Sequence, residues 1–452
     1  MVKRLITYLL LFATLAAGLP VAYAATGPGD IQGETYAVME VKTGQVLLEK
    51  AGDQKRAPAS ITKILTCALA LEKGGLDQKV TMERDTVYSI PANTTHIALE
   101  EGETLAVRDL LYSTILLSAN DAANGLAQYT GGSLDAFTGM MNRQVAELGL
   151  KNTHFNNAHG LDDPNHYTTA RDMAAITRWA LGVEGFRDLF GTLEYEMPET
   201  NKKKRDYDFI NQDAMLHDVN KVYYEGVEGG KLGYTDDAKH TIVTLAKRGD
   251  LELICVVLGS GLNTKYSDSA ALLDYCFSQF DVLTLPAGNI KDFVVPLSNG
   301  ADRIGNLDIH AAQDVSLIVE KGTTLRDLRY EYKVKDYYTE GEDIQPTLEL
   351  YDRHGTYMTT VSLVHTVVEA AQMPMSQVVR DQNRAKAQSG LATAAKWVGL
   401  FLLIVVALLF IVRFFVRLYY RRRQRRRRQA IRLHSRQAQQ QQRQRRQRIV
   451  GQ

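Results

Sequence analysis

The stretch Ala57-Pro58-Ala59-Ser60-Ile61-Thr62-Lys63 decides the fold. Pro58 ends any preceding strand, and residues 61–72 are mostly apolar with Gly74-Gly75 behind them, so a helix is predicted with Ser60 in its first turn. Residues three apart on a helix share a face, so we expect the amine of Lys63 beside the hydroxyl of Ser60. The helix N-terminus favours an oxyanion at that place. The stretch therefore predicts an activated serine nucleophile.

Two further motifs follow this stretch in order. Ser118-Ala119-Asn120 lies between a helix predicted for residues 105–117 and another for residues 121–129. Lys231-Leu232-Gly233 opens a segment with two strand-like runs, residues 241–247 and 251–258. A lone Ser-x-x-Lys match is usually a coincidence. Ser-x-x-Lys, Ser-x-Asn and Lys-x-Gly together are the signature of serine enzymes that react with penicillin.

The ends of the chain differ in character from its body. Residues 1–24 carry Lys3 and Arg4, an apolar stretch and Ala22-Tyr23-Ala24, which predicts a cleaved secretory signal, with an uncleaved anchor as the alternative. Residues 396–416 are apolar around one arginine and predict a transmembrane helix.

The charge distribution orients this predicted span. The formal net charge is only +1, yet fifteen arginines and no acidic residue lie between Arg413 and Gln452, so the body is acidic. The positive-inside rule then predicts a single-pass protein of the cell membrane, with its catalytic body extracytoplasmic and the basic tail, residues 417–452, cytoplasmic. Beside a span, such a tail favours anionic lipid over nucleic acid, and no nucleic-acid partner is expected.

Cysteine and histidine patterns favour neither disulfide nor metal chemistry. The three cysteines Cys67, Cys255 and Cys276 cannot all be paired, and two lie in apolar runs. The sequence has no His-Glu-x-x-His, Cys-x-x-Cys, Walker or Gly-x-Gly-x-x-Gly motif, so no metal site is predicted.

The order of the predicted elements indicates an α+β fold. A hairpin at residues 36–49 precedes the helices, and the two later strands and a helix at residues 270–280 follow them, which predicts one sheet with neighbouring N- and C-terminal strands. Short alternating runs then predict a small β-rich domain. The predicted boundaries are a catalytic domain at 25–285, the β-rich domain at 286–370 and, at 371–395, a linker or amphipathic helix.

The chain resembles the D-alanyl-D-alanine carboxypeptidases of the low-molecular-weight penicillin-binding proteins. The similarity spans about residues 30–370. Besides the three motifs, it includes His159-Gly160-Leu161 with Asp163-Pro164-Asn165-His166-Tyr167-Thr168-Thr169, and Gly233-Tyr234-Thr235. The resemblance implies a penicillin-recognising catalytic domain of the serine transferase/β-lactamase type, a β-rich domain and a membrane attachment. It implies removal of the terminal D-alanine from peptidoglycan stem peptides through an acyl-enzyme, acylation by β-lactam antibiotics, and no cofactor.

The same resemblance implies roles for individual residues. Ser60 would be the nucleophile and Lys63 its base, and Ser118 would relay a proton to the leaving amine. The implied substrate-binding residues include two backbone N–H donors of an oxyanion hole, at Ser60 and Tyr234; the set is Asn120, Lys231, Gly233, Tyr234 and Thr235.

Leu232 is a departure from the family pattern, which usually has threonine there. The missing hydroxyl removes a hydrogen bond to the substrate carboxylate that would contribute about 1.5 to 3 kcal/mol. Lys239 also stands where a glycine is common. Two alternatives therefore stay open: an envelope binding or regulatory protein of low activity on the same fold, and a D,D-endopeptidase or β-lactamase.

Overall fold

The computed structural model describes residues 27–204, 208–388, 396–397 and 401–416. The chain divides into two compact units. The first comprises the described residues of Met1–Ile290, Ala312–Glu331 and Glu349–Val361, and the second those of Lys291–Ala311, Tyr332–Leu348 and Ser362–Gln452. The predicted domain boundaries stay predictions, and the predicted signal (1–24) and basic tail (417–452) lie outside the described residues.

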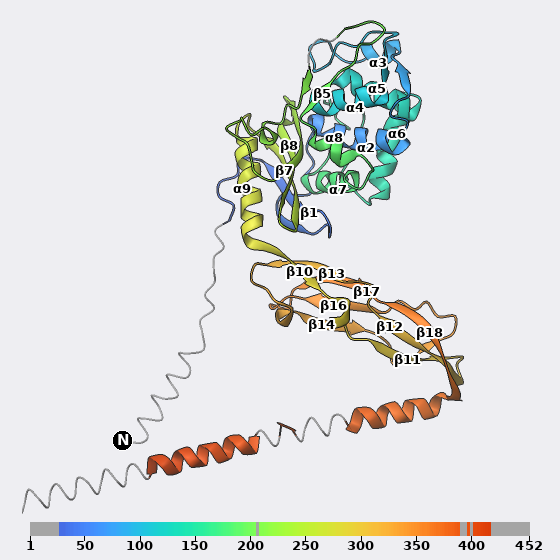
Figure 1. Cartoon of the computed structure of the whole chain (residues 1–452), viewed down its shortest axis with the longest axis vertical. Helices are drawn as coiled ribbons and strands as arrows, with labels where there is room; N and C mark the ends of the chain where they lie inside the picture. The colour runs from blue at the N-terminus through green and yellow to red at the C-terminus, as the bar shows by residue number, and fades with distance from the viewer. Residues whose placement is uncertain (1–26, 205–207, 389–395, 398–400, 417–452) are drawn as a thin grey trace, which may run out of the picture. The chain divides into compact units, whose positions relative to one another are not determined.

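A five-stranded antiparallel sheet forms the framework of the first unit, with the strand order β2-β1-β9-β8-β7 (Figure 1). Its strands are β1 (Thr35–Glu40), β2 (Val46–Lys50), β7 (Val227–Thr235), β8 (Lys239–Arg248) and β9 (Leu251–Ser260). β1 pairs with β9, Val38 opposite Cys255, which confirms the prediction that the first and last strands of the catalytic sheet are neighbours. β7 is an edge strand, so one side of its backbone is open.

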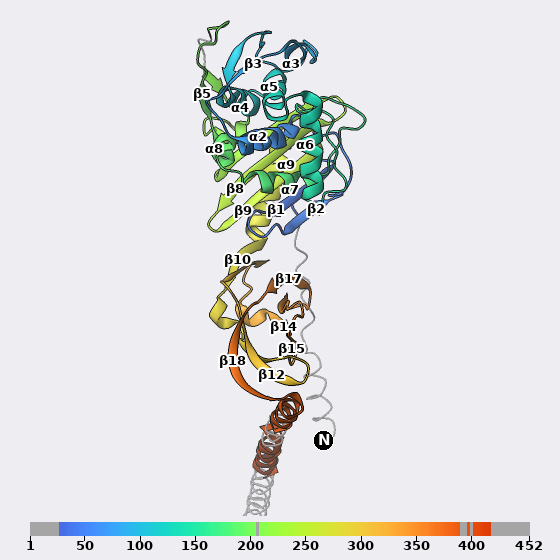
Figure 2. The same ribbon diagram turned by 90° about the vertical axis from the view of Figure 1, so that its right-hand side faces the viewer.

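Helices cover both faces of this sheet (Figure 2). α9 packs on one face together with apolar side chains of β8 and β9, and the other helices gather on the opposite face. β9 is therefore buried along almost its whole length, as its apolar sequence requires. The helices are α2 (Lys63–Lys73), α3 (Arg84–Tyr88), α4 (Val107–Leu116), α5 (Asn120–Gly131), α6 (Leu134–Glu147), α7 (Ala170–Ala180), α8 (Phe186–Gly191) and α9 (Thr264–Gln279).

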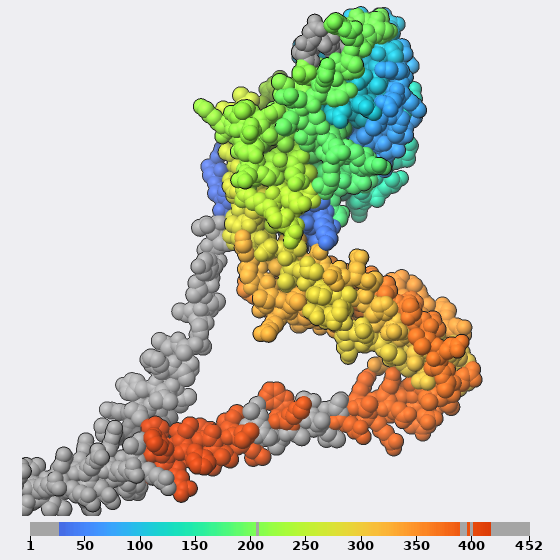
Figure 3. Space-filling view, in the orientation of Figure 1, coloured from blue at the N-terminus to red at the C-terminus, as the bar shows by residue number. Residues whose placement is uncertain are grey.

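Short elements complete the first unit, whose blue to green residues form one packed body in the space-filling view (Figure 3). The 3-10 turns are η1 (Ala59–Thr62), η2 (Ala214–Leu216), η3 (Ala287–Asn289) and η4 (Leu325–Asp327). Two small ladders are β3 (Lys79–Thr81) with β4 (Thr104–Ala106), and β5 (Glu194–Glu196) with β6 (Asp208–Ile210). A third joins β10 (Phe280–Leu285) to β13 (Val315–Glu320), and a three-stranded sheet has the order β14 (Arg329–Lys333), β16 (Thr347–Tyr351), β17 (Tyr357–Ser362).

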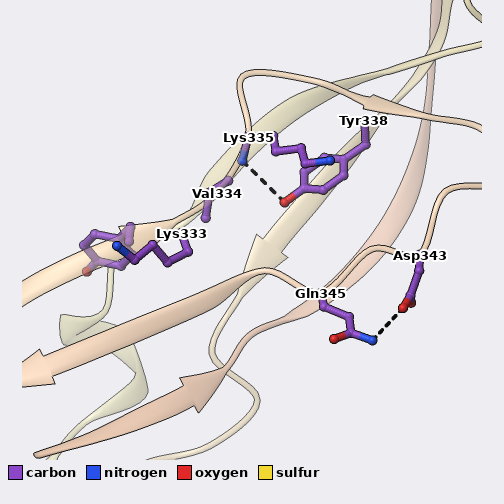
Figure 4. Close-up of a pocket in the computed structure, with 7 residues that line it drawn as sticks. Lys333, Val334, Lys335, Tyr338, Asp343 and Gln345 are labelled. Atoms are coloured by element: carbon purple, nitrogen blue, oxygen red, sulfur yellow. Dashed lines mark hydrogen bonds between the residues drawn. The ribbon is translucent and has the colours of Figure 1, made fainter.

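The second unit is built on a four-stranded sheet with the order β15-β11-β12-β18. Its strands are β11 (Phe293–Ser298), β12 (Asp302–His310), β15 (Tyr338–Thr339) and β18 (Val364–Pro374). The β-rich character was predicted, but β12 and β10 were missed, and β18 runs into the predicted linker before a helix over residues 375–388. A pocket of about 520 Å³ in this unit, where Gln345 donates to Asp343, contains none of the predicted site residues (Figure 4).

The described residues do not support the predicted transmembrane helix at 396–416. None of their helices is long and apolar enough to cross a membrane. Residues 398–400 of the predicted span lie outside the described residues.

Candidate active site

Ser60 lies in the 3-10 turn η1, directly before α2, close to its predicted place in the first turn of a helix. Lys63 begins α2, and its Nζ lies 2.8 Å from Ser60 Oγ. Nζ also donates to Asn120 Oδ1 at 2.7 Å and to the carbonyl oxygen of His159 at 2.6 Å. The structure thus brings two of the three motifs together around one amine, and the loop before α7 contributes a third wall.

The protonation of Lys63 follows from this setting. The side chain is fully buried, and burial together with the positive Lys231 holds the pKa of Lys63 well below its usual range. A neutral amine has two N–H groups and one lone pair. When the amine is neutral and its two N–H groups stay on Asn120 and His159, its lone pair is left for Ser60 Oγ, 2.8 Å away, so the amine can accept the hydroxyl proton. This is the geometry that a general base requires.

The second lysine contacts the second serine. Lys231 Nζ donates to Ser118 Oγ at 3.1 Å and to the carbonyl oxygen of Leu232 at 3.1 Å. Burial lowers the pKa of Lys231 to about 8, while the carboxylate of Asp213 acts in the opposite direction. Ser118 adopts φ 60°, a conformation rare for residues other than glycine, which marks the junction before α5 as constrained. Burial thus lowers the pKa of both lysines, and at pH 7 Lys231, with a pKa of about 8, still carries its charge.

Gly233 lets β7 pass close to the nucleophile. A Cβ added to Gly233 would lie 2.8 Å from the backbone nitrogen of Ser60 and would also collide with Thr241 Oγ1. Only glycine permits this approach of the edge strand to η1. The backbone nitrogen of Ser60 therefore faces β7, on the side of the cleft where the oxyanion is expected.

The side chains of the two predicted residues that follow Gly233 have hydrogen-bond partners outside the Ser60 turn. Tyr234 is 57% exposed, and its hydroxyl donates to Asp236 Oδ1. Thr235 Oγ1 donates to Asp162 Oδ1 at 2.6 Å, which ties β7 to the loop that precedes α7. Any direct part of Tyr234 in the oxyanion hole is thus a backbone one.

Leu232 lies on the opposite face of β7 from Lys231 and Gly233. Side chains alternate along a strand, and Leu232 packs among the apolar residues on the α9 side, which include Ile242 and Tyr266. A leucine in place of the usual threonine suggested a side chain that lines the cleft. The backbone of β7 does line the cleft, but the Leu232 side chain is partly buried on the other face of the strand.

Several residues of the site are not apparent from the sequence. The histidines of the polar loop 153–166 fit a solvated connector as well as a functional loop, and no motif points to Thr62, Asp213 or Thr241. His159 acts through its backbone oxygen, which no residue pattern can reveal. The Thr62 hydroxyl contacts His166 Nε2 at 2.9 Å across a separation of 104 residues. Only the folded structure shows that His159 contacts Lys63 and that His166 contacts Thr62.

Comparisons with known proteins agree with this arrangement. In one site of this α+β domain, Ser60 and Lys63 lie at the start of a buried helix, and Ser118 and Lys231 form a second serine–lysine pair beside the edge strand β7. This arrangement defines a serine hydrolase of the penicillin-binding-protein class. Residues 22–261 match the Peptidase S11 family of D-alanyl-D-alanine carboxypeptidases. The chain belongs to this family.

The relatives have the same layout over most of the chain. The D-alanyl-D-alanine carboxypeptidase DacF of Bacillus subtilis is 31% identical over 343 residues, which cover 74% of this chain and 86% of the relative. DacA of Escherichia coli is 32% identical over 321 residues, covering 68% and 75%. The crystal structure of penicillin binding protein 5 from Haemophilus influenzae matches with a TM-score of 0.64 at 26% identity, covering 75% of this chain and 97% of that one.

Proposed function

We propose that this protein is a serine-type D-Ala-D-Ala carboxypeptidase that removes the terminal D-alanine of peptidoglycan stem peptides through an acyl-enzyme on Ser60. The observation that carries the proposal is the buried amine of Lys63, which lies 2.8 Å from Ser60 Oγ and whose pKa burial lowers well below its usual range. Membership in the carboxypeptidase family supports the choice of substrate.

The reaction begins with attack of Ser60 Oγ on the carbonyl carbon of the penultimate D-alanine. The hydroxyl proton passes to Lys63 Nζ, and the new oxyanion is held by the N–H groups of Ser60 and Tyr234, each donor contributing about 3 to 4 kcal/mol. The peptide C–N bond then breaks, and Ser118 relays a proton to the leaving amine. Water hydrolyses the ester in a second step and regenerates Ser60.

Substrate binding uses the remaining groups. Asn120 Oδ1 accepts from Lys63, so the amide N–H group of Asn120 is the part that donates to the substrate backbone. The positive charge of Lys231, fixed beside Ser118, attracts the terminal carboxylate of the peptide. A β-lactam carries a carboxylate and a reactive carbonyl in a similar arrangement, so penicillin acylates the same serine.

The test uses the purified full-length chain in detergent and a peptide ending in D-Ala-D-Ala. We expect release of D-alanine and covalent labelling by a fluorescent penicillin, and neither in Ser60→Ala. Lys63→Ala should acylate about 10²- to 10⁴-fold more slowly, as for loss of a general base. A long-lived penicillin adduct favours the carboxypeptidase. Rapid hydrolysis of penicillin would instead indicate a β-lactamase, and cleavage only of cross-linked dimers would indicate an endopeptidase.

We also propose that the body acts outside the cytoplasm and that the C-terminal segment attaches it to the cell membrane. The support is the sequence alone: the Ala22-Tyr23-Ala24 site after an apolar leader, and the apolar residues that precede the arginine-rich tail. Protease added to spheroplasts should digest the body and leave a tail epitope intact. A body that resists the protease until the membrane is lysed would contradict this proposal.

A further inference from the structure

Ala59, the residue before the nucleophile, has an unusual backbone conformation. Its φ is 51°, in the left-handed region, although it carries a Cβ and its side chain is fully buried. For an L-residue other than glycine, this conformation costs about 1–2 kcal/mol. Such strain persists only where surrounding contacts impose it. The contacts that hold Ala59 therefore show what keeps Ser60 in place.

The carbonyl groups on both sides of the Ala59 Cα are fixed by hydroxyl groups from different elements. Thr241 Oγ1, on β8, donates to the carbonyl oxygen of Pro58 at 2.9 Å. Thr62 Oγ1 donates to the carbonyl oxygen of Ala59 at 2.8 Å. Gly160, at φ 92°, lies so close to the same oxygen that any Cβ there would collide with it. The Ala59 oxygen thus has almost no freedom to move.

His166 sets the direction in which the Thr62 hydroxyl donates. The backbone N–H of Asn156 donates to His166 Nδ1 at 2.9 Å, and Nε2 lies 2.9 Å from Thr62 Oγ1. The ring is 2% exposed, and burial lowers the pKa of His166 to about 3, so it is neutral and carries a single N–H. Because Nδ1 accepts, that N–H is on Nε2 and donates to Thr62. The Thr62 proton is then directed to Ala59.

A fixed carbonyl oxygen also fixes the N–H at the other end of the same peptide group. The group between Ala59 and Ser60 is planar and trans, so its C=O and N–H point in opposite directions. With the oxygen held by Thr62, the N–H of Ser60 points toward β7 at Gly233. This N–H is one of the two oxyanion donors in the proposed mechanism.

We propose that His166 is a positioning residue for acylation: through Thr62, it fixes the Ala59–Ser60 peptide so that the Ser60 N–H faces the developing oxyanion. The inference rests on the proposed function. His166, in the loop before α7, would then influence transition-state stabilisation without touching the substrate. The effect is expected in the rate of acylation and not in the binding of substrate.

The first test compares two replacements that each preserve one half of the ring. The amide nitrogen of His166→Gln can occupy the place of Nε2 and donate to Thr62, whereas the shorter amide of His166→Asn can replace only Nδ1. We expect His166→Asn to be acylated by a fluorescent penicillin about 10- to 100-fold more slowly, below the full loss of an oxyanion donor. His166→Gln should stay within about threefold of wild type. The affinity for a non-reacting product peptide should be unchanged in both.

The second test uses Thr62. Thr62→Ser keeps the hydroxyl and should acylate nearly as fast as wild type, while Thr62→Val has the same shape without the hydroxyl and should match the loss in His166→Asn. Both changes break one chain of hydrogen bonds, so the double variant His166→Asn/Thr62→Val should be no slower than Thr62→Val alone. Thermal melting verifies that each variant is folded.

Three results would overturn the inference: equal rates in His166→Asn and His166→Gln, losses that multiply in the double variant, or full activity in Thr62→Val. The ring of the wild-type protein provides a check that needs no variant. Nitrogen-15 NMR of the histidine-labelled chain should show His166 with a protonated Nε2 and a bare Nδ1 between about pH 5 and 8, and a charged ring or the other tautomer would contradict the inference. A wild-type chain that neither binds penicillin nor releases D-alanine would instead overturn the proposed function, and this inference with it.

Discussion

Two lysines in one site differ in pKa because their surroundings differ. Lys63 has three polar contacts, none of them an acid, and a like charge nearby, so its pKa lies well below its usual range. Lys231 is equally buried, but the carboxylate of Asp213 partly offsets the cost of burying its charge. The base and the cation of the proposed mechanism are therefore the same residue type, distinguished by a single acid on a neighbouring turn.

The two lysines predict a bell-shaped pH profile for acylation. The rate should fall as pH rises through about 8, because Lys231 then loses the proton that makes it attractive to a carboxylate. It should also fall on the acid side, because protonated Lys63 has no lone pair for the Ser60 proton. Measuring kcat/KM of the full chain between pH 4 and 10 checks both limbs. A rate that keeps rising above pH 9 would contradict the role of charged Lys231.

The carboxylate of Asp213 should set the pH at which the alkaline limb of the kcat/KM profile lies. Its carboxyl group is 1% exposed, and its Oδ2 has no hydrogen-bond partner within the described residues. Asp213→Asn removes the charge that supports protonated Lys231, so we expect the alkaline limb of kcat/KM to move to lower pH. The exposed acid Asp218 on the same segment serves as the control, and Asp218→Asn should leave the limb in place. An unmoved limb in Asp213→Asn would show that the alkaline pKa belongs to another group.

Leu232 can be tested as a missing donor. Its side chain lies behind β7 but is only partly buried at the open edge, so a threonine there can keep its methyl on the apolar cluster and turn its hydroxyl toward the edge. Leu232→Thr should raise kcat/KM for a D-Ala-D-Ala peptide by up to roughly tenfold, about 1.4 kcal/mol. Leu232→Val has the same branched shape without the hydroxyl and should not raise it. Equal kinetics in the two variants would exclude the hydroxyl as the cause.

At the scale of elements, the site depends on how closely β7 passes η1. The strand is an edge strand, and Gly233 is the point at which its backbone lies against the Ser60 turn. The loop before α7 closes the turn from the other side, with Gly160 against Ala59 and the His159 carbonyl oxygen on Lys63. Two segments distant in sequence, β7 and the loop before α7, therefore fix one turn of four residues.

Gly233→Ala tests this close approach. The added methyl would push β7 away from η1 and widen the cleft, and a displacement of about 1 Å can cost about 10²-fold in rate. We expect penicillin labelling to fall at least tenfold in Gly233→Ala. Gly288 has open space around its Cα, so Gly288→Ala is the matched control and should label like wild type. Normal labelling of Gly233→Ala would mean that the strand is not held against the turn.

At the scale of the whole molecule, packing without covalent cross-links stabilises the catalytic unit. Cys67, Cys255 and Cys276 are all free and buried, and burial raises the pKa of each thiol. Cys67 lies in the helical cluster, while Cys255 and Cys276 lie in the cluster on the α9 face. The three thiols therefore lie on both faces of the central sheet, so their reactivity reports on the packing of each face.

These thiols report on global unfolding. We expect essentially none of them to react with a thiol reagent in the native protein and all three to react in denaturant. The midpoint of thermal unfolding should be the same with and without a reductant, because no disulfide closes a loop. Fast labelling of the native chain, or a midpoint that drops on reduction, would contradict the packing described here.

The sequence alone predicted those parts of this protein that depend on local pattern. The helix behind Ser60, the junction at Ser118 and the last two strands of the sheet follow from apolar periodicity and breakers within a few residues. The full length of β7 was missed, because the glycines at 226, 229 and 230 weaken a strand pattern. β12 was missed in a polar run, and the end of β18 was placed in the predicted linker, because pairing in a sheet overrides weak local preference.

Only the tertiary structure decided how these pieces act on one another. The order of the three motifs predicted which side chains meet, but not that Lys63 donates to the carbonyl oxygen of His159 or that Leu232 faces away from Lys231. Nor does the sequence show that His166 lies behind Thr62, 104 residues away. Hydrogen bonds to backbone atoms and the face of a strand are set by the packing of distant segments. No pattern within one segment encodes them.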